Sequence, residues 1–550
     1  MTESVDEPKT KLYGLDDESR QMVLDMVDQL QERLLTKEKV LEFDQQEIFP
    51  EAIIRQMLGP DIGLQLLFIP EQYGGMGGGT RDCCAVTRRL SKICLGIGTA
   101  FFAIQLGADP LIVGGSEAQK EKWLGAIAEG QALVAYAVTE PGAGSNVAAI
   151  KTKADPVLDD QGNLTGYRIN GTKQFISTGG YADFITLLAN TPEGPTFFVV
   201  GKDTDGFDRG KGEVKHGIRA SNTSPLTFSD AFVPVENLIG GKPGQGLKQA
   251  NRVFGYTRLM VASMALGAGE AAMDIVIPYA KERIQFGAPL SEKQGYTHKL
   301  VVPHVVRLKA AAAYIDEIAL RLDAGESNLQ VEGSIAKLIT TEVANRAADD
   351  AIQALGGYGY ITEFGVEKIK RDVKITCIYE GTSEIQQSII STFRWRTTWK
   401  TKGGYYRKIA EEMARLANDT PESGCRYVGI AANLLNRLID LVHQNRLTKK
   451  QYIMFTLADL MTYVEVGAAV GRRAAINMDG AVTLAESRIF ANDVAKVAQD
   501  STMKILRASG AFEATEITSV LEDSDFDELQ LSYHRLIADL DQVAAILFGD

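Results

Sequence analysis

Glu380 is the residue whose neighbours most clearly suggest chemistry. It lies in CIYEGTSEIQQ (377–387), where Ile378 and Tyr379 precede it and Gly381 follows directly. A carboxylate among apolar neighbours loses solvation, which raises its pKa toward the range that a general base needs. Glutamates also serve as charges at helix N-termini or as halves of ion pairs. From the residues alone, both interpretations of Glu380 stay open.

The segment YAVTEPGAGSN (136–146) is a second candidate. Pro141, Gly142 and Gly144 predict an irregular, exposed loop after a strand. The backbone N–H groups of such a loop can approach a flat or anionic ligand closely. A plain Pro-Gly turn explains the same residues, so the loop by itself does not identify a site.

The size and charge of the chain limit what these residues can serve. At 550 residues it is too long for one core, and two to four domains are expected. Hydrophobic residues make up 45% and charged residues 23%, as in an ordinary globular protein. The net charge of −13 disfavours nucleic acid as a partner, because phosphate neutralisation needs a basic surface.

The cysteines, the histidines and the N-terminal residues bear on the cellular compartment and on metal binding. Five scattered cysteines indicate a reducing environment, and neither cysteines nor histidines show the spacing of metal ligands. The acidic N-terminus resembles neither a signal peptide nor a transit peptide. No run of 18 uninterrupted apolar residues suggests a membrane span. We therefore expect a cytoplasmic protein without a metal site.

The elements that must position these residues form a mostly helical chain with an inserted β domain. Helical periodicity predicts an N-terminal helical domain over 1–130, in which Ser116 and Gln119 have the spacing of a capping box. Short β-rich runs separated by turns predict an antiparallel barrel or sandwich over 131–245. Helices return as a bundle over 246–398, and an extra helical domain fills 405–550 after a linker at 400–404. A cleft is expected where the β domain meets the helices.

Five motifs in order give the chain a family resemblance. They are YAVTEPGAGSN, KQFISTGG (173–180), ERIQFG (282–287), QALGGYGY (353–360) and CIYEGTSEIQ (377–386). Over residues 40–395 the chain resembles the acyl-CoA dehydrogenase family, whose members hold FAD and an acyl-CoA thioester. The helical, β and helical order found above agrees with the fold of that family.

The resemblance implies the residues that contact FAD. Tyr136, Val138 and Thr139 would meet the isoalloxazine ring. Ser145 would lie between flavin and substrate, Phe175 would cover one flavin face and Ser177 would bond near N5. The ADP portion would be contacted across a subunit interface by Arg283, Phe286 and Gln294. The cofactor contacts are completed by Gln353, Gly357, Thr382 and Glu384.

The resemblance also implies the reaction and the role of Glu380. Glu380 would remove the α-proton while the β-hydrogen leaves as hydride to flavin N5, which gives a trans-2-enoyl-CoA. The Glu380 backbone N–H and a flavin hydroxyl would polarise the thioester, and Gly381 would allow close approach. Some relatives carry the base just before a helix arginine. Here that arginine is Arg258 and the residue before it is Thr257, which cannot act as a carboxylate base. Arg258 would instead orient the active-site segment or the CoA of the substrate.

Several choices stay open at this stage. Phe101 and Phe102 could line an apolar acyl pocket or lie in an ordinary core. The segment around them has no arginine that could bind a distal carboxylate, which disfavours a decarboxylating enzyme. Electrons would pass to an electron-transfer flavoprotein, as in fatty acid β-oxidation, and the alternatives are an acyl-CoA oxidase or a non-catalytic scaffold. The extension would leave either a homodimer or a homotetramer, and no membrane contact is expected.

Overall fold

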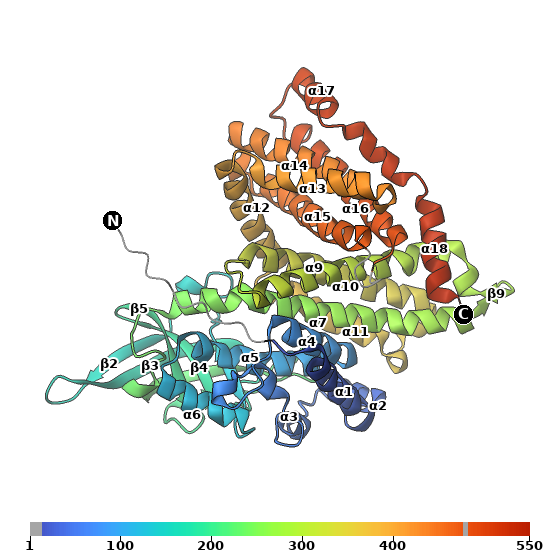
Figure 1. The fold of residues 1–550 in the computed structure, drawn as a ribbon. Helices are drawn as coiled ribbons and strands as arrows, with labels where there is room; N and C mark the ends of the chain where they lie inside the picture. The colour runs from blue at the N-terminus through green and yellow to red at the C-terminus, as the bar shows by residue number, and fades with distance from the viewer. Residues whose placement is uncertain (1–13, 477–481, 550) are drawn as a thin grey trace. The chain divides into compact units, whose positions relative to one another are not determined.

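The computed structural model describes residues 14–476 and 482–549 (Figure 1). The chain divides into two compact units, and each is described by itself. Unit 1 comprises Met1–Ala268 with Ala319–Gln330, and unit 2 comprises Gly269–Ile318 with Val331–Asp550.

Unit 1 begins with helices whose apolar faces make its core. They are α1 (Asp17–Arg33), α2 (Lys37–Gln45), α3 (Glu51–Met57), α4 (Thr80–Ile93), α5 (Leu95–Gly114) and α6 (Glu117–Ala128). The predicted capping box of α6 is confirmed: Ser116 N–H donates to Gln119 at 3.0 Å, and Gln119 N–H donates to the Ser116 hydroxyl at 3.3 Å. In α5, Phe101 and Phe102 are buried, and Phe101 packs edge-on against Phe68, so both belong to the core of this unit.

The β domain of unit 1 is one seven-stranded sheet. Its strands are β1 (Val134–Ala137), β2 (Lys153–Leu158), β3 (Leu164–Ser177), β4 (Phe184–Thr191), β5 (Gly194–Gly201), β6 (Phe207–Arg209) and β7 (Thr223–Pro234). They pair in the order β1-β4-β2-β3-β7-β6, and β5 pairs with β4. Most pairs are antiparallel, as expected, whereas β4 runs parallel to both β1 and β2. Alternate inward residues of the sheet form an apolar cluster that includes Tyr167, Phe198 and Phe228.

Unit 2 is helical apart from a two-stranded hairpin, and the long helix α7 (Gly246–Glu282) leads into it. The hairpin is β8 (Ile284–Gln285) and β9 (Ala288–Pro289). The bundle helices are α8 (Gln294–Leu300), α9 (Val302–Asp323), α10 (Gln330–Leu355), α11 (Val366–Val373) and α12 (Ser383–Lys400). The later helices are α13 (Gly404–Asp419), α14 (Cys425–Gln444), α15 (Gln451–Ala475), α16 (Leu484–Leu506), α17 (Ala514–Glu522) and α18 (Leu536–Phe548).

The extension is joined to the bundle inside unit 2 by a buried charge network. Arg394 on α12 donates to Glu465 on α15 at 2.7 and 2.8 Å, and to Glu332 on α10 at 2.8 Å. The Tyr406 hydroxyl of α13 donates to the same Glu465 at 3.0 Å. The extension therefore packs directly on the bundle. The segment predicted as a linker is only a turn between α12 and α13.

Within residues 14–476 and 482–549, three helices are long and apolar enough to span a membrane by length and composition. They are α5, α7 and α15, and 89%, 78% and 83% of their most apolar windows are buried inside the protein. Burial against other helices accounts for their apolar residues. The predicted fold class, a mostly helical chain with an inserted β domain, is confirmed.

Candidate active site

A buried ion pair fixes the first candidate loop, in unit 1. The Lys173 ammonium of β3 donates to the Val138 carbonyl at 2.9 Å and to Glu140 at 2.8 Å. Glu140 also accepts the backbone N–H groups of Lys151 at 2.6 Å and Thr152 at 3.0 Å. The carboxylate therefore closes the loop that follows β1, and Lys173 joins that loop to β3.

Burial and hydrogen bonding both shift the pKa values of this pair. The Lys173 and Glu140 side chains are 0% and 5% exposed. Burial lowers the pKa of Lys173 to about 8, although Glu140 opposes the shift. Burial acts to raise the pKa of Glu140, but the hydrogen bonds from Lys173, Thr152 and Lys151 lower it overall. Both groups are thus charged at neutral pH.

The second candidate segment of unit 1, KQFISTGG, lies beside this loop. The Gln174 N–H donates to the Thr139 carbonyl at 2.9 Å, which brings the two motifs together. The β3–β7 register shifts between Lys173 and Ile176, so Phe175 lies in a bulge. It has a φ of 60° and is 62% exposed. The left-handed backbone turns an aromatic ring outward, as expected of a ligand contact.

The remaining predicted residues of unit 1 are more dispersed. Ser177 is half-buried at the end of β3, and Tyr136 is half-buried on β1 with its ring 5.7 Å from that of Phe197. Ser145 is exposed on the loop. Arg258 is 6% exposed on α7 and donates to the Gln330 carbonyl at 3.5 Å, so its predicted contact with substrate stays a prediction.

The predicted base lies on a left-handed turn of unit 2. Glu380 is half-buried with a φ of 54°, and Gly381 follows with a φ of 91°. The buried Gln386 amide donates to both carbonyls, at 3.0 Å to Glu380 and 2.9 Å to Gly381. The buried ammonium of Lys337, on α10, donates to the Gly381 carbonyl as well. These donors fix a strained turn whose conformation a glutamate adopts only when its surroundings impose it.

Two predicted residues after this turn begin the next helix. Thr382 is the N-cap of α12, and its hydroxyl accepts the Ile385 N–H at 3.4 Å. The hydrogen bond with Thr382 lowers the pKa of the exposed Glu384, which lies in the first turn. Both residues thereby fix where α12 begins, and their contact with FAD stays a prediction.

Lys337 and Gln386 are the site residues that the sequence did not reveal. Gln386 lies inside the quoted motif, six residues after Glu380, at the start of a helix that can face back on the turn. Lys337 is 44 positions from Gly381, and nothing in its local sequence points there. A buried lysine is rare enough that only the structure identifies it.

The other predicted residues of unit 2 form a separate group. The Tyr279 and Tyr296 hydroxyls donate to the carbonyls of Leu355 and Ala354 at 3.3 and 3.1 Å. The Arg283 guanidinium lies over the Tyr358 ring at 5.6 Å. These contacts join Arg283, the end of α7 and α8 to the end of α10 and the turn after it. Gln294 begins α8, Gln353 and Gly357 lie at the end of α10 and just after it, and Phe286 lies in the turn of the hairpin.

This second group lies far from the base along α10. Lys337 contacts the Glu380 turn, whereas Gln353 is near the C-terminal end of the same helix. At about 1.5 Å per residue the two positions are roughly 24 Å apart. The two groups therefore cannot contact the same small substrate.

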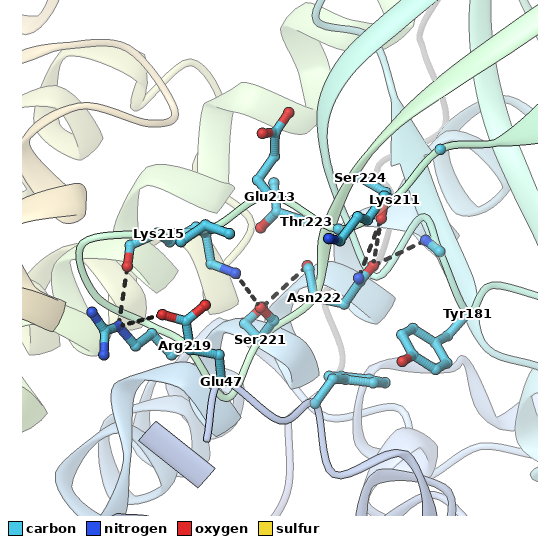
Figure 2. A pocket seen from close by; sticks show the side chains of 15 residues that line it. Glu47, Tyr181, Lys211, Glu213, Lys215, Arg219, Ser221, Asn222, Thr223 and Ser224 are labelled. Atoms are coloured by element: carbon cyan, nitrogen blue, oxygen red, sulfur yellow. Dashed lines mark hydrogen bonds and ion pairs between the residues drawn. The ribbon is translucent and has the colours of Figure 1, made fainter. Parts of the chain in front are cut away.

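Figure 2 shows a pocket of about 420 Å³ in unit 1, lined by none of the predicted site residues. Its polar groups bond to one another: Lys215 donates to the Ser221 carbonyl at 2.8 Å, and Arg219 to the Lys215 carbonyl at 3.1 Å. The Asn222 side chain accepts the Gly180 N–H at 2.9 Å. We interpret this region as structural support for the turn at residues 178–180, which follows Ser177.

Comparison with known proteins identifies the family. Models for the N-terminal, middle and C-terminal domains of acyl-CoA dehydrogenases match residues 17–131, 135–231 and 244–393. An acyl-CoA dehydrogenase of Bacillus subtilis (strain 168) is 37% identical over 66% of this chain and 98% of its own length. The chain belongs to the acyl-CoA dehydrogenase family.

Solved structures extend the comparison. An acyl-CoA dehydrogenase from Bacillus anthracis, in complex with FAD, is 25% identical with a TM-score of 0.83, covering 99% of this chain and 97% of its own. That likeness includes the extension. A chain in a structure of the electron transferring flavoprotein of Acidaminococcus fermentans is 34% identical with a TM-score of 0.64, covering 69% and 98%.

These findings confirm the predicted family and the class of enzyme, an oxidoreductase of the acyl-CoA dehydrogenase type. The predicted cofactor agrees with the FAD complex of the Bacillus anthracis protein. The individual site residues and the boundaries of the four domains stay predictions.

Proposed function

We propose that this chain is an FAD-dependent dehydrogenase that converts an acyl-CoA thioester to a trans-2-enoyl-CoA, with Glu380 as the α-proton base. The observation that carries the proposal is the Glu380 turn. Its left-handed backbone is fixed by Gln386 and Lys337, in the motif where the family resemblance expects the base. Backbone strain of this kind clusters at active sites and ligand-binding sites.

The residues of unit 1 have the properties that FAD requires. The exposed Phe175 ring offers a flat apolar face, the Ser177 hydroxyl lies two residues away, and the loop with Gly142 and Gly144 has open space around it. Tyr136, Val138, Thr139, Phe175 and Ser177 would hold the ring system. FAD bound there would supply the acceptor for the hydride from the β-carbon.

The chain's own groups perform the other half of the reaction. The Glu380 backbone N–H would donate to the thioester oxygen, which makes the α-proton more acidic. The Glu380 carboxylate would then take that proton. Ser145, Arg258 and Gly381 would orient the substrate, and Gly381 would leave space because it has no Cβ. Neither step requires a metal ion, and none is assigned.

We further propose an electron-transfer flavoprotein as the electron acceptor. The support is the family, together with the likeness to a chain from the Acidaminococcus fermentans electron transferring flavoprotein structure. An acyl-CoA oxidase, which uses oxygen, is the alternative. A cytoplasmic location is proposed from the cysteine content alone.

The test uses Glu380→Gln and measures anaerobic bleaching of the bound flavin by a panel of acyl-CoA thioesters. Loss of a general base should slow bleaching by about 10²- to 10⁴-fold, with FAD and acyl-CoA still bound. Glu363→Gln, at an exposed glutamate of the same unit, is the matched control and should bleach at the wild-type rate.

Full-rate bleaching by Glu380→Gln would show that another residue is the base. A wild-type protein without bound flavin, or without a response to any thioester, would favour the scaffold. Peroxide formation in air would favour the oxidase.

A further inference from the structure

The C-terminal helix α18 is anchored by a buried charge pair. The Arg488 guanidinium, on α16, donates to both oxygens of Asp539 at 2.9 and 2.6 Å. The Asp539 side chain is only 2% exposed. A bidentate pair of this kind fixes direction as well as distance, so the orientation of α18 within unit 2 is well defined.

Asp541 lies two positions after Asp539 and so points to the other side of α18. There it accepts the side-chain amide of Gln294 at 2.9 Å and the imidazole of His298 at 3.0 Å, both from α8. Figure 1 shows α18 running to the end of unit 2 that carries β9. One helix of the extension therefore connects α16 to the segment where the ADP contacts are expected.

The chemistry of this contact determines how Gln294 is oriented. A carboxylate can only accept hydrogen bonds, so the NH₂ of the Gln294 amide must face Asp541. Its carbonyl oxygen is then directed to the other side. Since Gln294 is exposed, that oxygen can accept a hydrogen bond from an adenine amino group or a ribose hydroxyl.

The surface beside Gln294 has the character of a contact face. Phe286 is 99% exposed on a left-handed backbone with a φ of 51°, and Tyr360 is 85% exposed. Arg283, over the Tyr358 ring, adds a cation. Exposed aromatic side chains on neighbouring segments are candidates for contact with a ligand.

We propose that Asp541 is a positioning residue that orients Gln294 toward the adenosine part of FAD, which makes the C-terminal extension part of the cofactor site. This inference rests on the proposed function. Asp541 acts through Gln294 and does not itself contact the cofactor.

The experiment measures the Kd of FAD and of FMN for the apoprotein by flavin fluorescence. The variants are Asp541→Ala, Asp541→Asn, Gln294→Ala and the double variant Gln294→Ala/Asp541→Ala. Asp527→Asn, an exposed acid of the extension, is the matched control and should bind FAD as the wild type does. FMN lacks the adenosine part and reports on the rest of the site.

Asp541→Ala should weaken FAD binding by about threefold to tenfold. Asp541→Asn should weaken it by less, since its amide oxygen can still accept from Gln294, although its NH₂ group no longer forces one orientation. Binding of FMN should not change. The double variant should bind FAD no worse than Gln294→Ala, because the effect of Asp541 passes through Gln294.

Unchanged FAD binding by Asp541→Ala would overturn the inference. So would an equal loss for FMN, or losses that add in the double variant, because either would indicate a general packing role. If the wild-type apoprotein binds no FAD, the proposed function fails as well, which separates the two failures.

Discussion

Two fully buried lysines support the two candidate segments, Lys173 in unit 1 and Lys337 in unit 2. Each donates to a backbone carbonyl next to predicted site residues: Lys173 to Val138, and Lys337 to Gly381. Buried lysines are rare, and each here appears where a loop must keep one conformation. The same device thus stabilises both segments.

The two lysines differ in what else supports the segment. Lys173 makes an ion pair with Glu140, and Glu140 in turn holds the backbone of Lys151 and Thr152. The carbonyl that Lys337 contacts has a second donor in Gln386. The unit 1 loop therefore depends on one pair of charges, whereas the unit 2 turn depends on converging hydrogen bonds. Glu140 is a structural carboxylate, and Glu380 is the candidate for chemistry.

The largest expected effect comes from Lys173→Met. It leaves the Glu140 carboxylate buried without its counter-charge, which should lower the free energy of unfolding of unit 1 by about 3–5 kcal/mol. FAD content should fall as well, because the loop of residues 139–146 loses its anchor. Urea denaturation and the flavin absorbance of the purified protein measure the two effects.

Lys202→Met is the matched control, because Lys202 makes a more exposed pair with Asp183 at 3.1 Å. It should change the free energy of unfolding by less than about 1 kcal/mol. Equal effects of the two substitutions would show that the buried pair is not special.

Gln386→Ala should have a smaller effect, and on catalysis more than on stability. The Gly381 carbonyl keeps Lys337, but the Glu380 carbonyl loses the Gln386 amide, so the turn becomes less well defined. We expect kcat to fall about 10- to 100-fold while KM for acyl-CoA changes little. Steady-state kinetics with an artificial electron acceptor separate the two constants.

Gln387→Ala controls for this change, since Gln387 bonds instead to Asp459 at 2.8 Å. If it lowers kcat as much as Gln386→Ala does, the Glu380 turn does not depend on Gln386.

The sequence predicts the fold well wherever a pattern is local. The 3.6-residue periodicity of α1 and the Ser116–Gln119 spacing both gave the right elements. Local propensity does not predict strand β2, KADPVL, because Asp155 and Pro156 disfavour strands, yet pairing with β3 places them opposite Arg168 and Tyr167. Tertiary pairing overrode local propensity there.

The candidate site was predicted only as far as its motifs extend. The motifs identify Glu380 and Phe175 as site residues. They do not reveal that both residues adopt left-handed backbone, since only glycine signals that conformation in a sequence. The contacts of Lys337 with Gly381 and of Asp541 with Gln294 join positions 44 and 247 apart. Such pairs depend on the packing of helices, which no local pattern specifies.

The smallest expected effect is a pH dependence of the unit 1 loop. The pKa of Lys173 is lowered by burial from 10.5 to about 8, so this side chain becomes neutral above that pH and the Glu140 pair loses its cation. FAD binding should therefore weaken by about threefold between about pH 7 and pH 9.

Folding stability should respond to Lys173 in the opposite direction. Between pH 8 and 10.5 the unfolded chain holds the Lys173 proton and the folded chain does not, so the contribution of this group to the free energy of unfolding rises with pH. Parallel measurement of the Kd for FAD and of urea denaturation across this range separates the two trends. In Lys173→Met, the Kd for FAD should lose its pH dependence. A wild-type Kd that stays constant would show that the loop does not need the Lys173 charge.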